Sequence, residues 1–471
     1  MPLIGREKEI KILENALQSL HSELIVVYGR RRVGKTFLIR ETYKKHIHFE
    51  FAGMYKASTR EQLKLFQQTL FNFSQQKIKA PINWLDAFQQ LKDYCDTLKG
   101  NKKKVLFIDE FPWLDNNKSS FLKAFDNFWN SYVTKRDDLV VVICGSAAAY
   151  MINKIIRSKG GLHNRLTDKI RVEPFNLKET ELLLKKNRVK LTHYDILNLY
   201  MAMGGIPHYL EKVKVGESAT QAIDRLCFEK DGFLRNEFKN VFASLFDQVD
   251  NHEAIIRILA DVRKGLSRNA ILKKGKFHSG GNLTRTLHEL EESGFIEQYA
   301  PYKGNNNALY RLKDEYCNFY IKYIEKNKPS KTGVWNKLQN QATFNSWAGF
   351  TFETICLKHI EQIKEGLKIA GIYATTGNWL EKNSENGAQI DLLIDRDDNV
   401  INLCEIKFYD GLFTLNKKYA FDLMNKVAVF KNSTQTKKSI FLTLITIHGI
   451  TENEYSRQLI QNNLTLEHLF L

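Results

Sequence analysis

The chain has 471 residues, of which 43% are hydrophobic, and it carries a formal charge of +17 at pH 7. A chain of this length predicts about three domains. With 26 glycines and only 7 prolines, a collagen-like or broadly disordered protein is excluded. The excess of basic residues favours a polyanionic partner, with nucleic acid, and DNA in particular, as the first expectation.

The six cysteines have neither the spacing of a zinc site nor that of a disulfide framework. None belongs to a Cys-x-x-Cys pair, and Cys144 and Cys404 fall in apolar, strand-like runs. Reduced core thiols of this kind are typical of a cytoplasmic protein. The first residues lack the apolar core of a signal peptide, and no apolar run reaches the ~18 residues that a membrane helix needs. We therefore expect a cytoplasmic protein without a membrane segment.

A phosphate-binding loop is the most specific signal in the chain. An apolar run at 24–28 has the length of a strand, and residues 29–36 read Gly-Arg-Arg-Arg-Val-Gly-Lys-Thr before a predicted helix at 37–43. This is the G-x-x-x-x-G-K-[ST] pattern between a strand and a helix, as its mechanism requires. Backbone N–H groups surround the β-phosphate, the lysine reaches the β- and γ-phosphates, and the threonine hydroxyl binds Mg²⁺. The sequence therefore predicts ATP and Mg²⁺ as cofactors.

Two carboxylates follow a second apolar run, at 104–108. Ligands bind at the carboxyl edge of a parallel sheet, so Asp109 and Glu110 are expected beside the phosphates. Asp109, together with Thr36, is predicted to hold Mg²⁺, and Glu110 is predicted to act as the general base on the attacking water. The residues expected to bind the nucleotide are Gly29, Arg30, Arg31, Arg32, Val33, Gly34, Lys35, Thr36, Phe37 and Asp109.

A third buried strand is predicted at 139–144 and ends before Ser146. Ser146 could sense the γ-phosphate or the attacking water, but an ordinary turn serine fits this position equally well. Farther on, Arg165 follows a glycine pair at 160–161. Arg165 is a candidate arginine finger, acting in cis or on a neighbouring subunit of a homo-oligomer, and a solvated or structural arginine is the alternative.

The middle of the chain is mostly helical. A glycine pair and a proline at 204–207 predict a helix start whose free N–H groups could face the nucleotide. Residues 250–315 then predict three helices and two strands, which is a winged helix-turn-helix. Its third helix offers only Arg285 and His288 beside three glutamates, so base recognition and a packing role stay equally open. The best linker candidate follows at 327–333.

A second group of charged residues lies in the last third of the chain. Two strands are predicted on either side of a turn at 396–399, so Asp391 and Glu405 are expected side by side. Lys407 lies on the same face as Glu405, and Glu353 falls on the preceding helix. Phosphodiester hydrolysis needs hard oxygen ligands for Mg²⁺ and a cation near the attacking water. The three acids could supply the ligands and the lysine the cation; acids and a lysine on exposed strands are the alternative.

The N-terminal half resembles the archaeal-type ATPase family, a branch of P-loop NTPases close to AAA+ and STAND proteins. The stretches that carry this resemblance are Gly5-Arg6-Glu7, Tyr28 to Thr36, Phe107 to Phe111, Gly145-Ser146, Asn164-Arg165-Leu166 and Gly204-Gly205-Ile206-Pro207. The remainder is similar to the winged helix and the PD-(D/E)xK nuclease-like domain often fused to this ATPase. Glu353, Asp391 and Glu405-Ile406-Lys407 match that nuclease motif, although no proline precedes Asp391.

The resemblance implies an α/β protein with a P-loop parallel sheet of AAA+ type, a helical lid, a winged helix and a restriction-endonuclease-like domain. The expected boundaries are 1–172 for the ATPase core, 173–246 for the lid, 247–326 for the winged helix and 331–471 for the nuclease-like domain. Two functions follow. One is an ATPase whose nucleotide state controls a nuclease-like domain that acts on nucleic acid. The other is a nucleotide-dependent switch or scaffold whose nuclease-like domain is inactive and binds partners.

Overall fold

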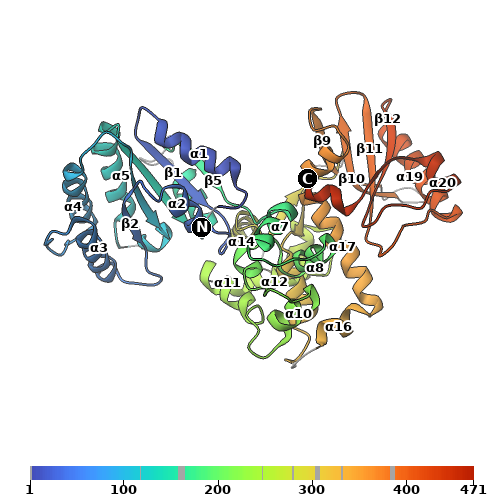
Figure 1. Ribbon diagram of the computed structural model, residues 1–471, viewed down its shortest axis with the longest axis horizontal. Helices are drawn as coiled ribbons and strands as arrows, with labels where there is room; N and C mark the ends of the chain where they lie inside the picture. Colours follow the sequence, from blue (N-terminus) through green and yellow to red (C-terminus); the bar gives the residue numbers. More distant parts are fainter. Residues whose placement is uncertain are drawn as a thin grey trace. The chain divides into compact units, whose positions relative to one another are not determined.

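The computed structural model describes residues 3–116, 118–157, 165–246, 248–277, 280–302, 308–329, 333–381 and 388–471. The chain divides into two compact units (Figure 1). The first comprises Met1–Pro174 with Glu292–Gly294, and the second comprises Phe175–Glu291 with Phe295–Leu471. The glycine pair at 160–161, Asn164 and positions 330–332 of the predicted linker lie outside the described residues.

The first unit is built on a parallel five-stranded sheet in the order β2–β3–β4–β1–β5. Its strands are β1 (Glu23–Tyr28), β2 (Ile47–Ala52), β3 (Lys104–Asp109), β4 (Leu139–Gly145) and β5 (Asp168–Arg171). Strands β3 and β4 are buried along their whole length, as expected for apolar runs in a parallel sheet. The predicted α/β class and parallel P-loop sheet are thus confirmed. Strand β5 was not predicted, because this short edge strand is mostly charged.

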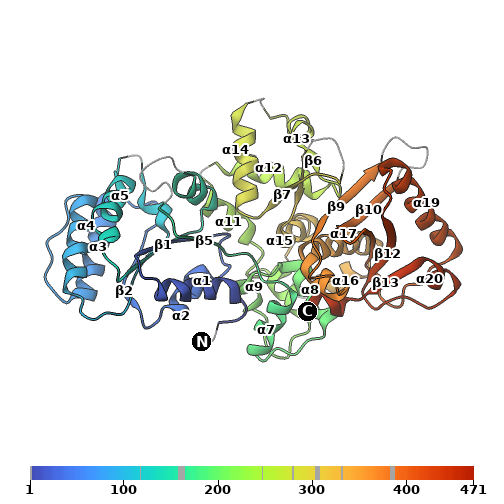
Figure 2. The ribbon, with the colours of Figure 1, turned by 90° about the horizontal axis from the view of Figure 1, so that it is seen from above.

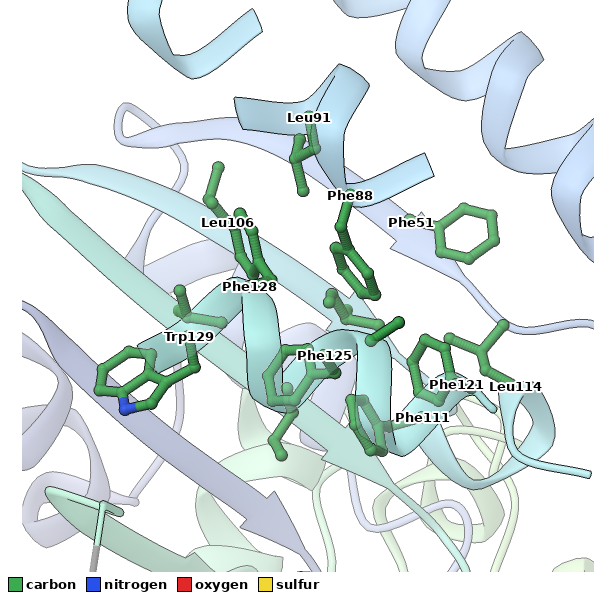
Figure 3. Close-up of a cluster of buried hydrophobic side chains, with 14 of the residues drawn as sticks. Phe51, Phe88, Leu91, Leu106, Phe111, Leu114, Phe121, Phe125, Phe128 and Trp129 are labelled. Atoms are coloured by element: carbon green, nitrogen blue, oxygen red, sulfur yellow. The ribbon is translucent and has the colours of Figure 1, made fainter. Parts of the chain in front are cut away.

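Helices flank this sheet. They are α1 (Glu7–Gln18), α2 (Lys35–Thr42), α3 (Thr59–Ser74), α4 (Trp84–Thr97), α5 (Phe121–Ser131) and the short α6 (Ala148–Tyr150). The apolar spacing at residues 63–73 predicts one long helical region up to about residue 100, whereas the structure has two helices, α3 and α4, with Pro81 in the break between them. Between α4, α5 and the sheet lies a cluster of aromatic rings (Figure 3). Phe88 stacks on Phe128 with ring centroids 5.1 Å apart, and Phe111 meets Phe125 edge-on at 5.0 Å.

The second unit begins with helices and continues into a small sheet. The helices are α7 (Leu177–Lys186), α8 (His193–Met203), α9 (Pro207–Leu210), α10 (Ala219–Ile223), α11 (Glu237–Leu245), α12 (Val249–Ala260), α13 (Arg268–Gly275) and α14 (Gly281–Glu292). The small sheet has the order β6–β8–β7, with β6 (Leu266–Ser267), β7 (Ile296–Tyr299) and β8 (Leu309–Leu312). The three helices and two strands predicted for 250–315 are present, and β6 is an addition. Pro207 begins a helix, as predicted.

The last third of the chain forms a mixed sheet with helices around it. The first helices are α15 (Glu315–Phe319), α16 (Val334–Gln339), α17 (Ala342–Lys358) and α18 (Ile360–Gly366). The strands that come next are β9 (Ala374–Glu381), β10 (Ala388–Arg396) and β11 (Val400–Lys407). The chain ends with α19 (Lys417–Thr434), β12 (Ser439–Thr446), α20 (Glu454–Leu459) and β13 (Ile460–Leu464). The sheet order is β13–β12–β11–β10–β9, antiparallel from β9 to β11 and parallel beyond. Figure 2 shows α19 beside this sheet, against which it packs Leu423 and Phe430. Within the described ranges, no helix has the length and apolar character needed to cross a bilayer.

A buried histidine joins α7 to the end of α17. The N–H of Leu177 has no acceptor within α7, because it lies in the first turn of the helix, and it donates to Nε2 of His359 at 3.0 Å. The other ring nitrogen, Nδ1, lies 2.8 Å from the carbonyl oxygen of Ile355. This pattern places the proton on Nδ1 and requires a neutral imidazole. Burial accordingly lowers the pKa of His359 to about 4.

We expect this histidine to make the protein less stable in mild acid. Below pH 6.5, the ordinary pKa of histidine, His359 binds a proton in the unfolded chain but stays neutral in the folded protein. The free energy of unfolding therefore falls as the pH drops towards 4. The loss should reach roughly 2 to 3 kcal/mol near pH 4 and vanish above pH 7, where both states are neutral. Urea unfolding at several pH values measures this loss of stability.

His359→Gln keeps an acceptor but does not titrate, so the stability of this variant should fall less in acid than that of wild type. Exposed His448→Gln is the control, and parallel curves for all three proteins would contradict the assignment.

Candidate functional site

The phosphate-binding loop is a tight backbone turn between β1 and α2. Gly29, Arg32 and Gly34 have positive φ angles of 136°, 71° and 89°. A Cβ on Gly29 would lie 2.4 Å from the carbonyl oxygen of Val172, so glycine is required there. The buried Lys35 donates from Nζ to two carbonyl oxygens of the loop at 2.9 and 3.0 Å. The loop therefore holds an ammonium group where phosphate oxygens are expected to bind.

The predicted acids lie next to this loop. Thr36 Oγ1 donates to Asp109 Oδ2 at 2.7 Å, so two oxygens suited to Mg²⁺ lie together. The Glu110 carboxylate accepts from the hydroxyl and the N–H of Ser146 at 2.6 and 3.3 Å. Lys35 Nζ lies 3.4 Å from the same hydroxyl. Five residues from three strand ends thus form one connected group at the carboxyl edge of the sheet, and the donor set fits a nucleotide with its cation.

The remaining residues of the predicted site differ in exposure. Arg30 and Val33 are buried, Arg31 and Arg32 are half-buried, and Phe37 is exposed on α2. Their roles towards the nucleotide stay predictions.

Arg165 lies at another edge of the first unit. It is exposed on a turn three residues before β5, and the N–H of Thr167 donates to the carbonyl of Leu24 near the start of β1. This places Arg165 near the amino edge of the sheet, whereas Lys35 and Asp109 lie at the carboxyl edge. The placement gives no support to an arginine finger in cis and leaves two alternatives, a finger on a neighbouring copy and a solvated or structural arginine.

A second group of acids lies on the mixed sheet of the second unit. Strands β10 and β11 pair with Leu392 opposite Cys404, and the next pair in this register is Asp391 and Glu405. The two acids are thus neighbours across the hairpin, as their spacing predicted. The N–H of Ile406 donates to Asp391 Oδ2 at 3.1 Å, which fixes this carboxylate at the strand.

Two lysines bind the Glu405 carboxylate. Lys407 donates to Oε1 at 2.9 Å, and Lys426, on α19, donates to Oε2 at 2.7 Å. Burial alone would raise the pKa of Glu405, but the charges and hydrogen bonds of the two lysines hold it below its ordinary value. Lys426 was not among the predicted residues, because no local pattern links a helix position to a strand that precedes it by many residues.

Glu353, on α17, completes the group. It lines a pocket of about 390 Å³ together with Asp391 and Lys407. Burial and then the negative charge of Asp391 raise the pKa of Glu353 to about 8. Burial and the charge of Glu405 raise the pKa of Asp391 to about 6. The three acids therefore lie close together, and the positive charges of the two lysines mainly offset the negative charge of Glu405.

The acids do not form a ready-made metal site. Across the part of the chain that the structure describes, no three His, Cys, Asp or Glu side chains are arranged to hold a metal ion. At this pocket both oxygens of Glu405 already accept from ammonium groups. Carboxylate oxygens are nevertheless the donor type that Mg²⁺ prefers, so these residues suit a cation chemically, whereas the lysine contacts of Glu405 oppose one.

The comparison with known families matches two regions of the chain. Residues 3–213 match a family described as "ATPase domain predominantly from Archaea", and residues 316–420 match one described as "Archaea bacterial proteins of unknown function". The first match confirms the predicted ATP-binding region. Its description names an ATPase domain, while the second match assigns no function.

Four similar proteins come from archaea. The "Uncharacterized protein MJECL04" of Methanocaldococcus jannaschii is 27% identical over 428 residues, which is 90% of this chain and 91% of that protein. The "Uncharacterized ATP-binding protein MJ1076" of the same organism is 23% identical over 307 residues, which is 57% of this chain and 86% of that protein. Among solved structures, the Walker-type ATPase PABY2304 of Pyrococcus abyssi has a TM-score of 0.49 and 17% identity, covering 68% of this chain and 96% of that one. The ORC2 protein of Aeropyrum pernix has a TM-score of 0.43 and 14% identity, covering 76% and 96%.

We expect Lys35→Ala to lower the affinity for ATP at least ~100-fold, because a charge aimed at the phosphates is lost. Glu110→Gln should bind ATP as well as wild type and turn over ~100- to 10,000-fold more slowly, because it keeps the shape and loses the base. Calorimetry with ATP and Mg²⁺ measures binding, and phosphate release measures turnover. Lys44→Ala, which removes an exposed charge just after α2, is the control. Wild-type affinity in the Lys35→Ala protein would show that the loop is not the ATP site.

Proposed function

We propose that this chain, an archaeal-type P-loop ATPase over residues 3–213, couples ATP hydrolysis to metal-dependent cleavage of nucleic acid by its C-terminal region. One observation carries the proposal. Glu353, Asp391 and Lys407 line one pocket, and Glu405 is the neighbour of Asp391 across the hairpin. These are the groups that phosphodiester hydrolysis needs. The charge of +17 supports a polyanionic substrate, DNA first.

In the ATPase cycle, Thr36 and Asp109 would hold Mg²⁺ and Lys35 would bind the β- and γ-phosphates. Glu110 would take the proton of the attacking water. The bond from Ser146 to Glu110 keeps this carboxylate at the strand end, so Ser146 acts as a positioning residue for the base.

In this proposal residues 1–172 form the ATPase core, 173–246 a helical lid, 247–326 a winged helix and 331–471 a PD-(D/E)xK nuclease-like domain. The three helices α12 to α14 with the sheet β6–β8–β7 support the winged helix. Asp391 and Glu405 lie on the antiparallel strands β10 and β11, and the sheet continues from β11 into the parallel strands β12 and β13. This arrangement supports the nuclease-like domain.

At the C-terminal site a bound divalent cation would supply the Lewis acid that polarises the phosphate. Glu353, Asp391 and Glu405 would hold it. Lys407 would orient the attacking water and offset charge on the phosphate oxygens. Lys426 would keep Glu405 ionised when Lys407 turns to the substrate.

A second candidate function is a nucleotide-dependent switch or scaffold whose C-terminal domain only binds partners. The observation that favours it is the double ion pair of Glu405, which occupies both oxygens of a predicted metal ligand. Domains of one fold regularly lose or change their activity, so the fold alone does not decide between the candidates.

We propose that Arg165 acts on the nucleotide of a neighbouring copy of the chain. ATP turnover per molecule should then rise with protein concentration, and Arg165→Ala should flatten this dependence and lower the plateau about 1,000-fold. Lys169→Ala, an equal loss of charge on the adjacent strand, should behave as wild type. Turnover of Arg165→Ala equal to wild type at every concentration would remove the proposal.

The decisive variants of the C-terminal site are Lys407→Ala and Asp391→Asn. Lys407→Ala should keep the affinity for Mn²⁺, since no ligand is lost, and should cut cleavage at least ~100-fold. Asp391→Asn should lose both, because an amide is a poor ligand for a hard cation. Calorimetry with Mn²⁺ and cleavage assays on linear, circular and single-stranded DNA and on RNA, with and without ATP, measure these effects.

Lys418→Ala is the matched control, since it removes one exposed lysine of α19. Binding of nucleic acid at low salt should survive in all three variants, because it depends on the diffuse basic charge. A wild type without metal-dependent cleavage of any substrate, together with an unaltered Lys407→Ala, would instead establish the switch or scaffold.

A further inference from the structure

The acidic pocket has a wall that does not belong to the mixed sheet. Arg263 and Lys264, on the turn between α12 and β6, line the same pocket as Glu353, Asp391, Lys407 and Lys426. Both turn residues are exposed. Resting on the proposed function, we infer that Arg263 and Lys264 bind backbone phosphates of a single nucleic-acid strand and position it across the acids.

The turn is held firmly enough to position a ligand. The hydroxyl of Tyr299 donates to the carbonyl oxygen of Lys264 at 2.6 Å. Gly265 has a φ of 64°, and a Cβ there would lie 2.5 Å from the carbonyl oxygen of Tyr310. The Arg263 guanidinium donates to the carbonyl oxygen of Ser346 on α17 at 3.2 Å. The small sheet and α17 thus fix the turn from two sides, and less order is lost when a strand binds.

The charges of the two walls differ. On the sheet side, Lys407 and Lys426 are paired with Glu405. On the turn side, Arg263 donates only to neutral oxygens of Ser346 among the described hydrogen bonds, although its charge also acts on Glu353, and Lys264 projects as an exposed ammonium. A strand carries one phosphate per nucleotide, so the phosphate at the acids has neighbours on either side. Arg263 and Lys264 supply positive charge for such a neighbour.

The size of the pocket indicates the kind of substrate. A volume of about 390 Å³ is at the lower end of the ~300–1,000 Å³ of ordinary small-ligand sites. This volume suits a short stretch of one strand and is small for the body of a duplex. Single-stranded nucleic acid, or the frayed or flapped end of a duplex, is therefore the substrate class.

The test is binding of a fluorescent single strand of about 12 nucleotides to the full chain in EDTA, where metal-dependent cleavage does not intervene. The double variant Arg263→Ala/Lys264→Ala should bind about 10-fold more weakly at moderate salt. The slope of log K against log salt should fall by about 1.4, since two contacts with a single strand are lost. Lys273→Ala/Lys274→Ala removes two exposed charges from the adjacent α13 and is the matched control. It should keep the slope of wild type.

Single variants separate positioning from folding. Lys264→Ala changes an exposed side chain and should lose about half of the effect. Arg263→Lys keeps the charge and should recover most of the binding that Arg263→Ala loses; an arginine with a purely structural role would show no such rescue. An equal loss in the two double variants would overturn the inference, and so would tighter binding of a blunt duplex than of the single strand in the wild-type protein.

The outcomes also separate this inference from the proposed function. If the wild type cleaves, the double variant should raise KM about 10-fold and leave kcat within a few-fold, because positioning residues on a neighbouring phosphate act mainly on binding. Cleavage with an unchanged KM would overturn the inference and leave the nuclease in place. A wild type that never cleaves, with binding lost only in the Arg263→Ala/Lys264→Ala protein, would support the inference and reject the nuclease.

Discussion

Three carboxyl groups lie together in a partly buried place of the second unit, where Lys407 and Lys426 supply positive charge to Glu405 and burial raises the pKa of the other two. Removing charged groups from water is costly, and their mutual attraction offsets this cost only when the geometry is good. Both ion pairs of Glu405 are within 2.9 Å. One lysine comes from the strand of the acid and the other from α19, so the pocket exists only when this helix lies on the sheet.

The two sites of the chain use lysine in different ways. In the phosphate-binding loop, Lys35 donates to two carbonyl oxygens of its own loop, and only the more distant Ser146 hydroxyl comes from elsewhere in the chain. In the pocket, the interacting groups come from α17, β10, β11, α19 and the turn before β6. The first arrangement depends mainly on the backbone geometry of one turn. The second depends on how several segments pack, and any movement of the small sheet alters its wall.

This difference explains what could be predicted from the sequence. The loop, the apolar strands and the pairing of Asp391 with Glu405 follow from local patterns and from the alternation of side chains along a strand. Strand β5 and the break before α4 were missed, because one is short and charged and the other lies in a polar stretch. Lys426, Arg263 and Lys264 meet the acids only through tertiary packing. The exposed position of Arg165 near the amino edge of its sheet likewise depends on the unpredicted β5.

The aromatic cluster of the first unit connects the residue after the predicted base to a buried tryptophan. Phe111 directly follows Glu110 and lies 4.9 Å from Phe121, which in turn meets the buried indole of Trp84 at 4.8 Å. Packed interiors transmit small displacements because they have little free volume. If Glu110 shifts when a nucleotide binds, the environment of Trp84 should change with it, so the emission of this residue, one of six tryptophans in the chain, is expected to respond to nucleotide.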